Sequence, residues 1–333
     1  MSETMKERAE RAIEEKVFPG CVVGVVRANG RREVLPFGRL TYDGASPGVR
    51  ENTLYDLASV TKSIPTASLA ALFVAEGKLQ LKDPVKKYIP ELQNDFDASI
   101  ENLLRYEVRG VRMSTLDFPT FEQVRTHVLE QGFQGPPSLS EYTNFPALLL
   151  GIILERISGE VLPALAHKYF FSPLAMNDTT FFPAPRSSSE VGPHDDRVAP
   201  TEVVEGKEIR GIVHDESARM FAAKRRAVGH AGLFSTAPDL LNFLEALLQG
   251  KFPIIVEFAR EGLGWQREGD ILGSHPNAGT FGKTGFTGTS VVVDPVSGVA
   301  FTILSNRTYP KRPENSDAMN SFRADVADLI RSS

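Results

Sequence analysis

The sequence predicts an α+β fold in which a central antiparallel sheet is formed from both ends of the chain and is flanked by helices. Two observations predict it: β-prone runs gather near the two termini, and helical patterns separated by loops fill the middle. The length of 333 residues allows one large domain or two of ordinary size. Because strands at both ends would complete one sheet, we expect a single domain over 1–333. Residues 1–58 and 255–333 would supply its sheet part, and residues 59–254 an inserted helical part.

The first expected elements are a helix and a hairpin. In residues 5–13 apolar side chains recur at three- and four-residue spacing among charges, which predicts an amphipathic helix. Two β-prone runs follow, over residues 20–26 and 32–37, with Asn29-Gly30 between them. Asn-Gly is the strongest short-range signal for a hairpin. We therefore expect the first two strands to pair.

Four helices are expected in the middle of the chain, and their ends carry start and stop residues. Gly159, Pro173 and Gly250 stand where three of them stop, and Thr236 offers a capping hydroxyl followed by proline and aspartate. The loop over residues 183–211 contains several prolines and charges and is long enough for a lid or an irregular excursion. The four helices cover residues 59–76, 146–158, 162–171 and 236–250.

The strand pattern returns near the C-terminus. Residues 290–293 and 299–304 are β-prone and flank the turn-forming segment 294–298, which predicts a second hairpin. Residues 321–330 are expected to close the chain as a helix.

Composition excludes several classes of function. Lys and Arg number 37 against 42 Asp and Glu, so the net charge is −5, and this offers no basic field for nucleic acid. The single cysteine, Cys21, allows no intramolecular disulfide and is expected to be a small buried hydrophobe. The N-terminus is too charged for a signal peptide, and the densest apolar stretch, 147–154, is too short to span a membrane. We expect a soluble, cytoplasmic protein unless a leader was removed.

The first candidate for chemistry is Ser59-Val-Thr-Lys62, an S-x-x-K at the start of an expected helix. The spacing puts both side chains on one face, one turn apart, where an amine can help to remove the serine proton. The helix N-terminus also favours developing negative charge. Alone the pattern is common, and a capping serine with a solvated lysine would explain it as well.

Two further motifs strengthen this interpretation. Tyr142-Thr-Asn144 precedes an apolar helix, and Lys283-Thr284-Gly285 leads into the returning strands. Each is common alone, but all three in this order arise by chance in roughly one chain in fifty. Each also falls where nucleophilic catalysis needs it: at a helix start, at a loop of the helical part and at a strand edge.

With these motifs, the sequence resembles the serine β-lactamase and penicillin-binding-protein superfamily, in particular its class C-like branch. That branch contains class C β-lactamases, D-alanyl-D-alanine peptidases and family VIII carboxylesterases. The resemblance implies a β-lactamase/transpeptidase-like fold and covers nearly the whole chain. The other stretches that carry it are Phe18-Pro-Gly-Cys-Val-Val-Gly, Leu57-Ala-Ser-Val-Thr-Lys62, Leu150-Gly-Ile-Ile-Leu-Glu155, Gly232-Leu-Phe-Ser-Thr236, Gly285-Phe-Thr-Gly-Thr-Ser290 and Ser305-Asn306-Arg307.

The resemblance implies roles for the first two motifs. Ser59 is similar to the acylating nucleophile and Lys62 to its partner amine. Tyr142 resembles the residue that two lysines keep partly anionic, which passes the proton to the leaving group and later activates water. Asn144 would orient the acyl side chain of the substrate.

The third motif would complete the site. Lys283 would supply positive charge to the tyrosine and to a substrate carboxylate, with Thr284 and Gly285 beside it in substrate binding. The backbone N–H groups of Ser59 and Phe286 would form the oxyanion hole. No cofactor and no metal is implied.

One stretch departs from the family pattern. Where members commonly carry His-Thr-Ser-Gly, this chain has Arg105-Tyr-Glu-Val-Arg-Gly110, after the expected helix over 100–104. The departure puts the helical wall of the site and its substrate preference in doubt, but not the nucleophile.

Other motifs compete for function and are weaker. Ser46 fits G-x-S-x-G, but Pro47 follows it and its flanks are polar loop, so it is not expected to be a nucleophile. His194-Asp195-Asp196 and His214-Asp215 lack metal-ligand spacing and are interpreted as hydrogen-bonded His–Asp pairs in loops.

Three hypotheses about function remain open at this point. Esterase-type hydrolysis of small acyl esters is preferred, because the chain shows no export signal. β-Lactamase or D-Ala-D-Ala carboxypeptidase activity on carboxylate-bearing amides is the alternative, because Lys-Thr-Gly suits such substrates. A sensor that stays acylated is the third, although the retained tyrosine favours turnover. The expected partner is therefore a small ester, β-lactam or D-Ala peptide.

Overall fold

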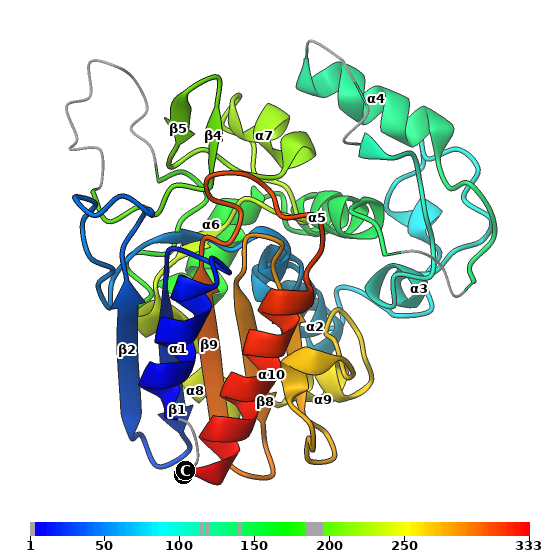
Figure 1. Cartoon of the computed structure of the whole chain (residues 1–333). Helices are drawn as coiled ribbons and strands as arrows, with labels where there is room; N and C mark the ends of the chain where they lie inside the picture. The colour runs from blue at the N-terminus through cyan, green and yellow to red at the C-terminus, as the bar shows by residue number, and fades with distance from the viewer. Residues whose placement is uncertain (1–3, 114–115, 117–119, 139–141, 184–195) are drawn as a thin grey trace.

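The structure is a computed structural model that describes residues 4–113, 116, 120–138, 142–183 and 196–333. Its centre is an antiparallel sheet with strand order β2-β1-β9-β8-β7, so the first and last strands of the chain are neighbours (Figure 1). The pairing of β1 with β9 sets Val23 opposite Ile303. The expected α+β arrangement with a sheet built from both termini is confirmed. The five strands are β1 (Gly20–Arg27), β2 (Arg32–Gly38), β7 (Phe281–Thr284), β8 (Ser290–Asp294) and β9 (Val299–Ser305).

Helices cover both faces of this sheet. On one face lie α1 (Met5–Glu14) and α10 (Asp317–Ser332) (Figure 1). Phe322 of α10 meets Phe18 edge-on, with 4.9 Å between ring centroids. On the other face α8 (Ala237–Leu248) packs against β1 and β9. A strand buried on both faces reads as a near-continuous apolar run, and both β8, with three consecutive valines, and the largely apolar β9 are buried throughout.

The remaining elements form the helical part and its small sheets. Strand β3 (Tyr55–Asp56) pairs with β6 (Phe234–Ser235), and β4 (Glu202–Val204) pairs with β5 (Lys207–Ile209). The other helices are α2 (Ser68–Ala75), α3 (Ile100–Leu104), α4 (Phe121–Gln131), α5 (Phe145–Ser158), α6 (Leu162–Ala166), α7 (Glu216–Ala222) and α9 (Pro253–Arg260).

Local start and stop signals acted as expected. Asn-Gly joins β1 to β2, Thr236 caps α8 by accepting a hydrogen bond from the Asp239 N–H, and Gly159 ends α5 in the left-handed conformation. The C-terminal helix is longer than the expected 321–330, because its first turn begins at Asp317.

The helix expected over 59–76 is interrupted. Residues Ala58–Lys62 form a 3₁₀ turn, Ser63–Ala67 a π turn, and only then does α2 begin. The break is at Ile64, whose φ of −117° and ψ of 107° are not helical. Proline disfavours the helical conformation of the residue before it and has no N–H to donate, so Pro65 explains the break.

By length and composition, residues 58–75 pass the test for a membrane-crossing helix. However, 78% of this stretch is buried inside the molecule, which is the pattern of a core helix.

The expected loop over 183–211 is partly outside the described residues, which exclude 184–195. Its described second half contains the β4–β5 hairpin, which the sequence did not predict.

Candidate active site

All three sequence motifs reach one cleft of about 470 Å³ beside the edge strand β7. Ser59, Tyr142 and Lys283 all line it, although 83 residues separate the first two in the chain (142 − 59). Lys283 and Thr284 lie in β7, and both the N–H and the hydroxyl of Thr284 donate to Gln266 Oε1. The other lining residues are Arg105, Tyr106, Gly262, Trp265, Gln266, Gly285, Phe286, Arg307, Ser316, Asn320 and Arg323.

Ser59 stands on a strained turn that a buried carboxylate holds. Ala58, the residue before it, has a φ of 45°, which is uncommon for a residue with a side chain. The Ala58 N–H donates to Asp56 Oδ1 at 2.8 Å, and the His214 N–H donates to Asp56 Oδ2 at 2.7 Å. The Asp56 side chain thus fixes the turn that presents the serine.

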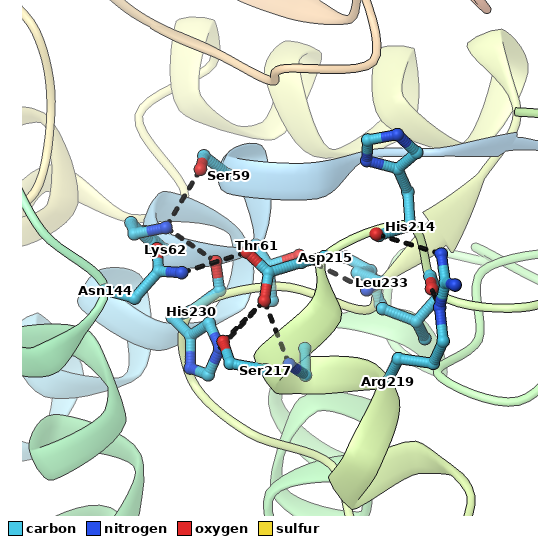
Figure 2. Close-up of polar contacts among 12 residues, drawn as sticks. Ser59, Thr61, Lys62, Asn144, His214, Asp215, Ser217, Arg219, His230 and Leu233 are labelled. Carbon is cyan, nitrogen blue, oxygen red and sulfur yellow. Dashed lines mark hydrogen bonds and ion pairs between the residues drawn. The ribbon is translucent and has the colours of Figure 1, made fainter. Parts of the chain in front are cut away.

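Lys62 is buried and contacts the serine directly. Its Nζ donates to Ser59 Oγ at 2.9 Å and to the His230 carbonyl oxygen at 2.8 Å (Figure 2). Burial lowers the pKa of Lys62 to about 7, and the charge of Asp215 opposes that effect. A lysine with this pKa is partly neutral at neutral pH, so it can accept the serine proton.

Tyr142 lies between the two lysines of the site. The centre of its ring is 5.3 Å from Lys62 Nζ and 4.8 Å from Lys283 Nζ. Although 52% of the residue is exposed, desolvation raises its pKa, a hydrogen bond with Ser59 lowers it, and the charge of Asp215 raises it. The net shift is upward. The expectation that two lysines keep this tyrosine partly anionic stays a prediction.

Tyr106 is a site residue that motif analysis did not name. It lies in the departure 105–110, has a φ of 56°, and its ring is 5.1 Å from that of Tyr142. Lys283 Nζ lies 4.6 Å from its ring centre, so two aromatic faces cover this ammonium. Burial, and then the charge of Lys62, lower the pKa of Lys283 well below its usual value. The departure itself was the signal, because it marked where the helical wall of the site differs.

The turn after β7 is tied to the segment that precedes the serine. Thr287 Oγ1 donates to the Asp56 carbonyl oxygen at 2.6 Å, and Thr289 Oγ1 donates to the Leu57 carbonyl oxygen at 3.0 Å. A Cβ on Gly285 would lie 2.3 Å from that Leu57 oxygen. This close approach requires glycine.

Two arginines hold the carbonyl groups of the same turn. Arg323 donates to the Gly285 oxygen at 3.1 Å, and Arg307 Nε donates to the Phe286 oxygen at 2.8 Å. The Gly285 carbonyl and the Phe286 N–H belong to one peptide group, and a charged donor on the carbonyl makes that N–H a stronger donor. In the described part of the chain no group accepts a hydrogen bond from the Phe286 N–H. It is free to bind an oxyanion.

A second polar cluster lies behind Lys62. Asn144, just before α5, donates its Nδ2 to Asp215 Oδ2 at 2.9 Å (Figure 2). Asp215 Oδ1 also accepts from Ser217 Oγ at 2.6 Å, and this hydroxyl is 3.0 Å from His230 Nε2. Sequence analysis interpreted Asp215 as half of a His–Asp pair and not as a site residue, because Asn144 and His230 come from distant segments.

The predicted loop His–Asp pairs need correction. His214 does not pair with its neighbour: its Nε2 is 2.7 Å from Glu202 Oε1, while Asp215 has His230 at 3.4 Å. Adjacent side chains in an extended segment point to opposite sides, which separates the two. The pair at 194–195 lies outside the described residues, and the described part of the chain contains no group of side chains that could hold a metal.

Ser46 has a local role. Its buried Oγ accepts the Thr41 N–H at 3.1 Å, and its carbonyl oxygen accepts from Arg39. These bonds close a loop beside β2, and Ser46 does not line the cleft described above.

Comparison with known proteins agrees with this geometry. The family model described as Beta-lactamase matches residues 5–325. An N-acetylmuramyl-L-alanine amidase of Bacillus subtilis is 24% identical over 92% of this chain and 81% of its own length. A putative D-alanyl-D-alanine carboxypeptidase of Escherichia coli K12 is 28% identical over 82% of this chain and 73% of its own length. The solved structure of EstCE1, a hydrolase with promiscuous acyltransferase activity, superposes with a TM-score of 0.74 at 21% identity, over 97% and 96% of the two chains.

The family match spans almost the whole sequence, and the fold and the three motifs agree with it. The chain therefore belongs to the β-lactamase family, and it is a serine hydrolase of that superfamily with a β-lactamase/transpeptidase-like fold.

Proposed function

We propose that this protein hydrolyses small acyl esters and related activated acyl compounds through a covalent acyl-enzyme on Ser59. The observation that carries the proposal is the 2.9 Å contact between Lys62 Nζ and Ser59 Oγ at the bottom of a cleft. Neutral Lys62 takes the serine proton as Oγ attacks the carbonyl carbon, and a tetrahedral intermediate forms. A nucleophile and base within hydrogen-bond reach are the minimum that this chemistry needs.

The remaining steps use the tyrosine and the backbone. The N–H groups of Ser59 and Phe286 bind the oxyanion of the intermediate. The Tyr142 hydroxyl gives its proton to the leaving alkoxide or amine as the carbonyl–heteroatom bond breaks, and the proton on Lys62 then restores the phenol. In the second half, water gives a proton to the Tyr142 oxygen as the phenol passes its own proton to neutral Lys62, and the hydroxide attacks the ester carbonyl on Ser59. The bond to Ser59 Oγ then breaks, Lys62 returns the proton to Oγ, and the acid leaves.

The charge of the cleft favours substrates that carry a carboxylate. Its described lining contains Arg105, Lys283, Arg307 and Arg323 and no acidic side chain. Burial lowers the pKa of Arg323 to about 9, and the charge of Arg307 acts in the same direction. An anionic substrate would relieve this accumulation of positive charge. Among esters and amides, we infer a preference for those with a carboxylate near the scissile bond.

The second candidate, hydrolysis of β-lactams or D-Ala peptides, draws on the same cationic lining. The names of two relatives agree with this candidate in part. One is a putative D-alanyl-D-alanine carboxypeptidase, and the other is an N-acetylmuramyl-L-alanine amidase. The structural neighbour, described as a hydrolase with promiscuous acyltransferase activity, shares the fold and does not decide between the two candidates.

A matched pair of esters tests the proposal. 3-Acetoxybenzoate carries a carboxylate on its leaving phenol, and its methyl ester does not. The kcat/KM of each ester is first divided by the rate constant for its hydrolysis by hydroxide. We expect this ratio to be about 10- to 150-fold higher for the acid than for the methyl ester, because a charge-assisted contact contributes about 1.5–3 kcal/mol. Equal values would remove the carboxylate preference and leave the ester hydrolase.

Nitrocefin and a D-Ala-D-Ala peptide complete the panel and decide on the second candidate. Intact-mass spectrometry in the first turnover should show one acyl group, on Ser59. Stoichiometric labelling without turnover on every substrate would identify the acylated sensor, and absence of any Ser59 adduct would end the acyl-enzyme proposal.

A further inference from the structure

We propose that Asp215 is a positioning residue of this site: its partly buried carboxylate orients Asn144 and supplies the negative charge that faces Lys62 from behind. The inference rests on the proposed acyl-enzyme chemistry at Ser59 and adds a residue that none of the three motifs contains. Figure 2 shows Asp215 at the centre of the polar contacts, between the Ser59–Lys62 side and α7.

The Asp215 carboxylate is held rigidly. It caps α7, so its Oδ1 accepts the Ala218 N–H at 2.9 Å, and the same oxygen accepts Ser217 Oγ at 2.6 Å. Burial would raise the pKa of Asp215, but its hydrogen bond with His230 and those from Ser217 and Ala218 outweigh that effect and hold the pKa well below its usual range. Asp215 is therefore an anion at every pH at which the enzyme would be assayed.

This anion determines how Asn144 is presented. An ionised carboxylate only accepts hydrogen bonds, so the bond of 2.9 Å to Asp215 Oδ2 must come from the Asn144 amide nitrogen. The amide can then not flip, and its oxygen faces away from Asp215. Asn144 lines a cavity of about 520 Å³ together with Tyr142, next to the cleft. A fixed amide at that position orients the acyl part of a substrate.

Asp215 also balances the charges around Lys62. The ionisable groups that face this lysine are Tyr142, Lys283, His230 and Asp215. His230 is buried, and burial lowers its pKa, so it is neutral near pH 7. Asp215 is then the anion that opposes the effect of burial on the pKa of Lys62. Without it, two lysines would share a desolvated pocket.

The test is the pH dependence of kcat/KM for the Asp215→Asn variant. Asparagine keeps the size and the helix-capping oxygen, removes the charge, and replaces the oxygen that accepts the Asn144 amide by a donor. The rise of kcat/KM at the acid side of the profile (the acid limb) reports loss of the Lys62 proton. Because an anion raises the pKa of a nearby amine, removal of the Asp215 charge should move this limb to lower pH by about one unit. The same carboxylate raises the pKa of Tyr142, so the basic limb should move the same way. A merely structural role would lower activity evenly and leave both limbs in place.

Glu216→Gln is the matched control. This carboxylate is the next residue along the chain, but it is half exposed and paired with Arg312. The limbs should stay within about 0.2 pH units of the wild type, because solvent screens an exposed charge. If Glu216→Gln shifts the profile as much as Asp215→Asn, the effect belongs to net charge and the inference is overturned.

Two further measurements keep the outcomes separate. Wild-type protein that forms no Ser59 adduct with the esters refutes the proposed function itself. If the wild type forms the adduct and the pH profile of Asp215→Asn is the same as that of the wild type, only the role of Asp215 is refuted. If Asp215→Asn does not fold by thermal melting, Asp215→Ser, which keeps a capping hydroxyl, is measured against the same criterion.

Discussion

The site has two buried lysines, and their surroundings differ. Lys62 donates hydrogen bonds to Ser59 and to a backbone carbonyl, and Asp215 faces it as a counter-charge. Lys283 packs against the faces of Tyr106 and Tyr142, and the charge that acts on it is that of the other lysine. One side of the site is thus balanced for moving a proton near neutral pH. The other side gathers positive charge.

The excess of positive charge continues beyond Lys283. Arg307 and Arg323 donate to backbone carbonyls and to the Asn320 side chain, and neither has a carboxylate partner among the described residues. A buried cation that has no anion in its own chain is costly unless a ligand supplies one. The comparison indicates that bond breaking belongs to the side of Lys62 and charge recognition to the side of Lys283 and the arginines.

The largest expected effect is loss of the nucleophile on the Lys62 side. Ser59→Ala should lower turnover by at least about 10³-fold, because no acyl-enzyme can form. Steady-state assays with both esters, together with intact-mass spectrometry, check this. Ser46→Ala should keep its activity, since that hydroxyl only accepts the Thr41 N–H. An adduct on Ser46 would contradict the assignment.

Next in size is the proton carrier between the two sides. Tyr142→Phe keeps the ring against both ammonium groups and removes only the hydroxyl. We expect turnover to fall by about 10² to 10⁴, the usual contribution of a general acid–base group. A loss below threefold, measured under saturating ester, would show that another group carries the proton.

Lys283→Met decides whether its ammonium serves the tyrosine or the substrate. Because two rings cover this ammonium, we expect 3-acetoxybenzoate and its methyl ester to lose activity by the same factor, about 10- to 150-fold for a charged contact. The ratio of the two kcat/KM values is the measurement. If the acid loses at least tenfold more than the methyl ester, Lys283 binds the carboxylate directly, and the arginines alone do not recognise the charge.

The smallest effect is expected at Arg323. Arg323→Lys keeps the charge but removes the guanidinium group, whose Nη2 donates to both the Gly285 and the Thr289 carbonyl oxygens. Removal of a whole oxyanion donor costs about 10²- to 10³-fold, and weakening one should cost less, about three- to tenfold on both esters. Unchanged rates, with an unchanged melting temperature, would show that the Phe286 N–H needs no such support.

Sequence patterns predicted the parts of the molecule that local rules control. The Asn29-Gly30 hairpin, the cap at Thr236 and the stop at Gly159 each depend on a few neighbouring residues. The three motifs were recognisable for the same reason, since each is a short run whose order in the chain is informative. The structure adds that these runs meet at one cleft.

The rest depends on contacts that no local pattern contains. Asp215 looked like half of a His–Asp pair, and only the fold brings Asn144 and His230 to it. Tyr106 was visible only as a departure from a family pattern, and its role depends on rings from two loops meeting over Lys283. The interruption at Ile64 is different: Pro65 marks it locally, and it was missed because the apolar spacing continues through it.

The adjacency of the first and last strands determines when the protein can become active during its synthesis. Strand β1 is synthesised well before its partner β9, which pairs Ser305 with Cys21. The helix that carries Arg323 follows later still. Until then β1 has only β2 beside it in the sheet, and one of its edges stays unpaired. A nascent chain that already contains Ser59, Lys62 and Tyr142 is therefore still an unfinished enzyme, and a premature stop before β9 (Val299–Ser305) would leave it with an open sheet edge.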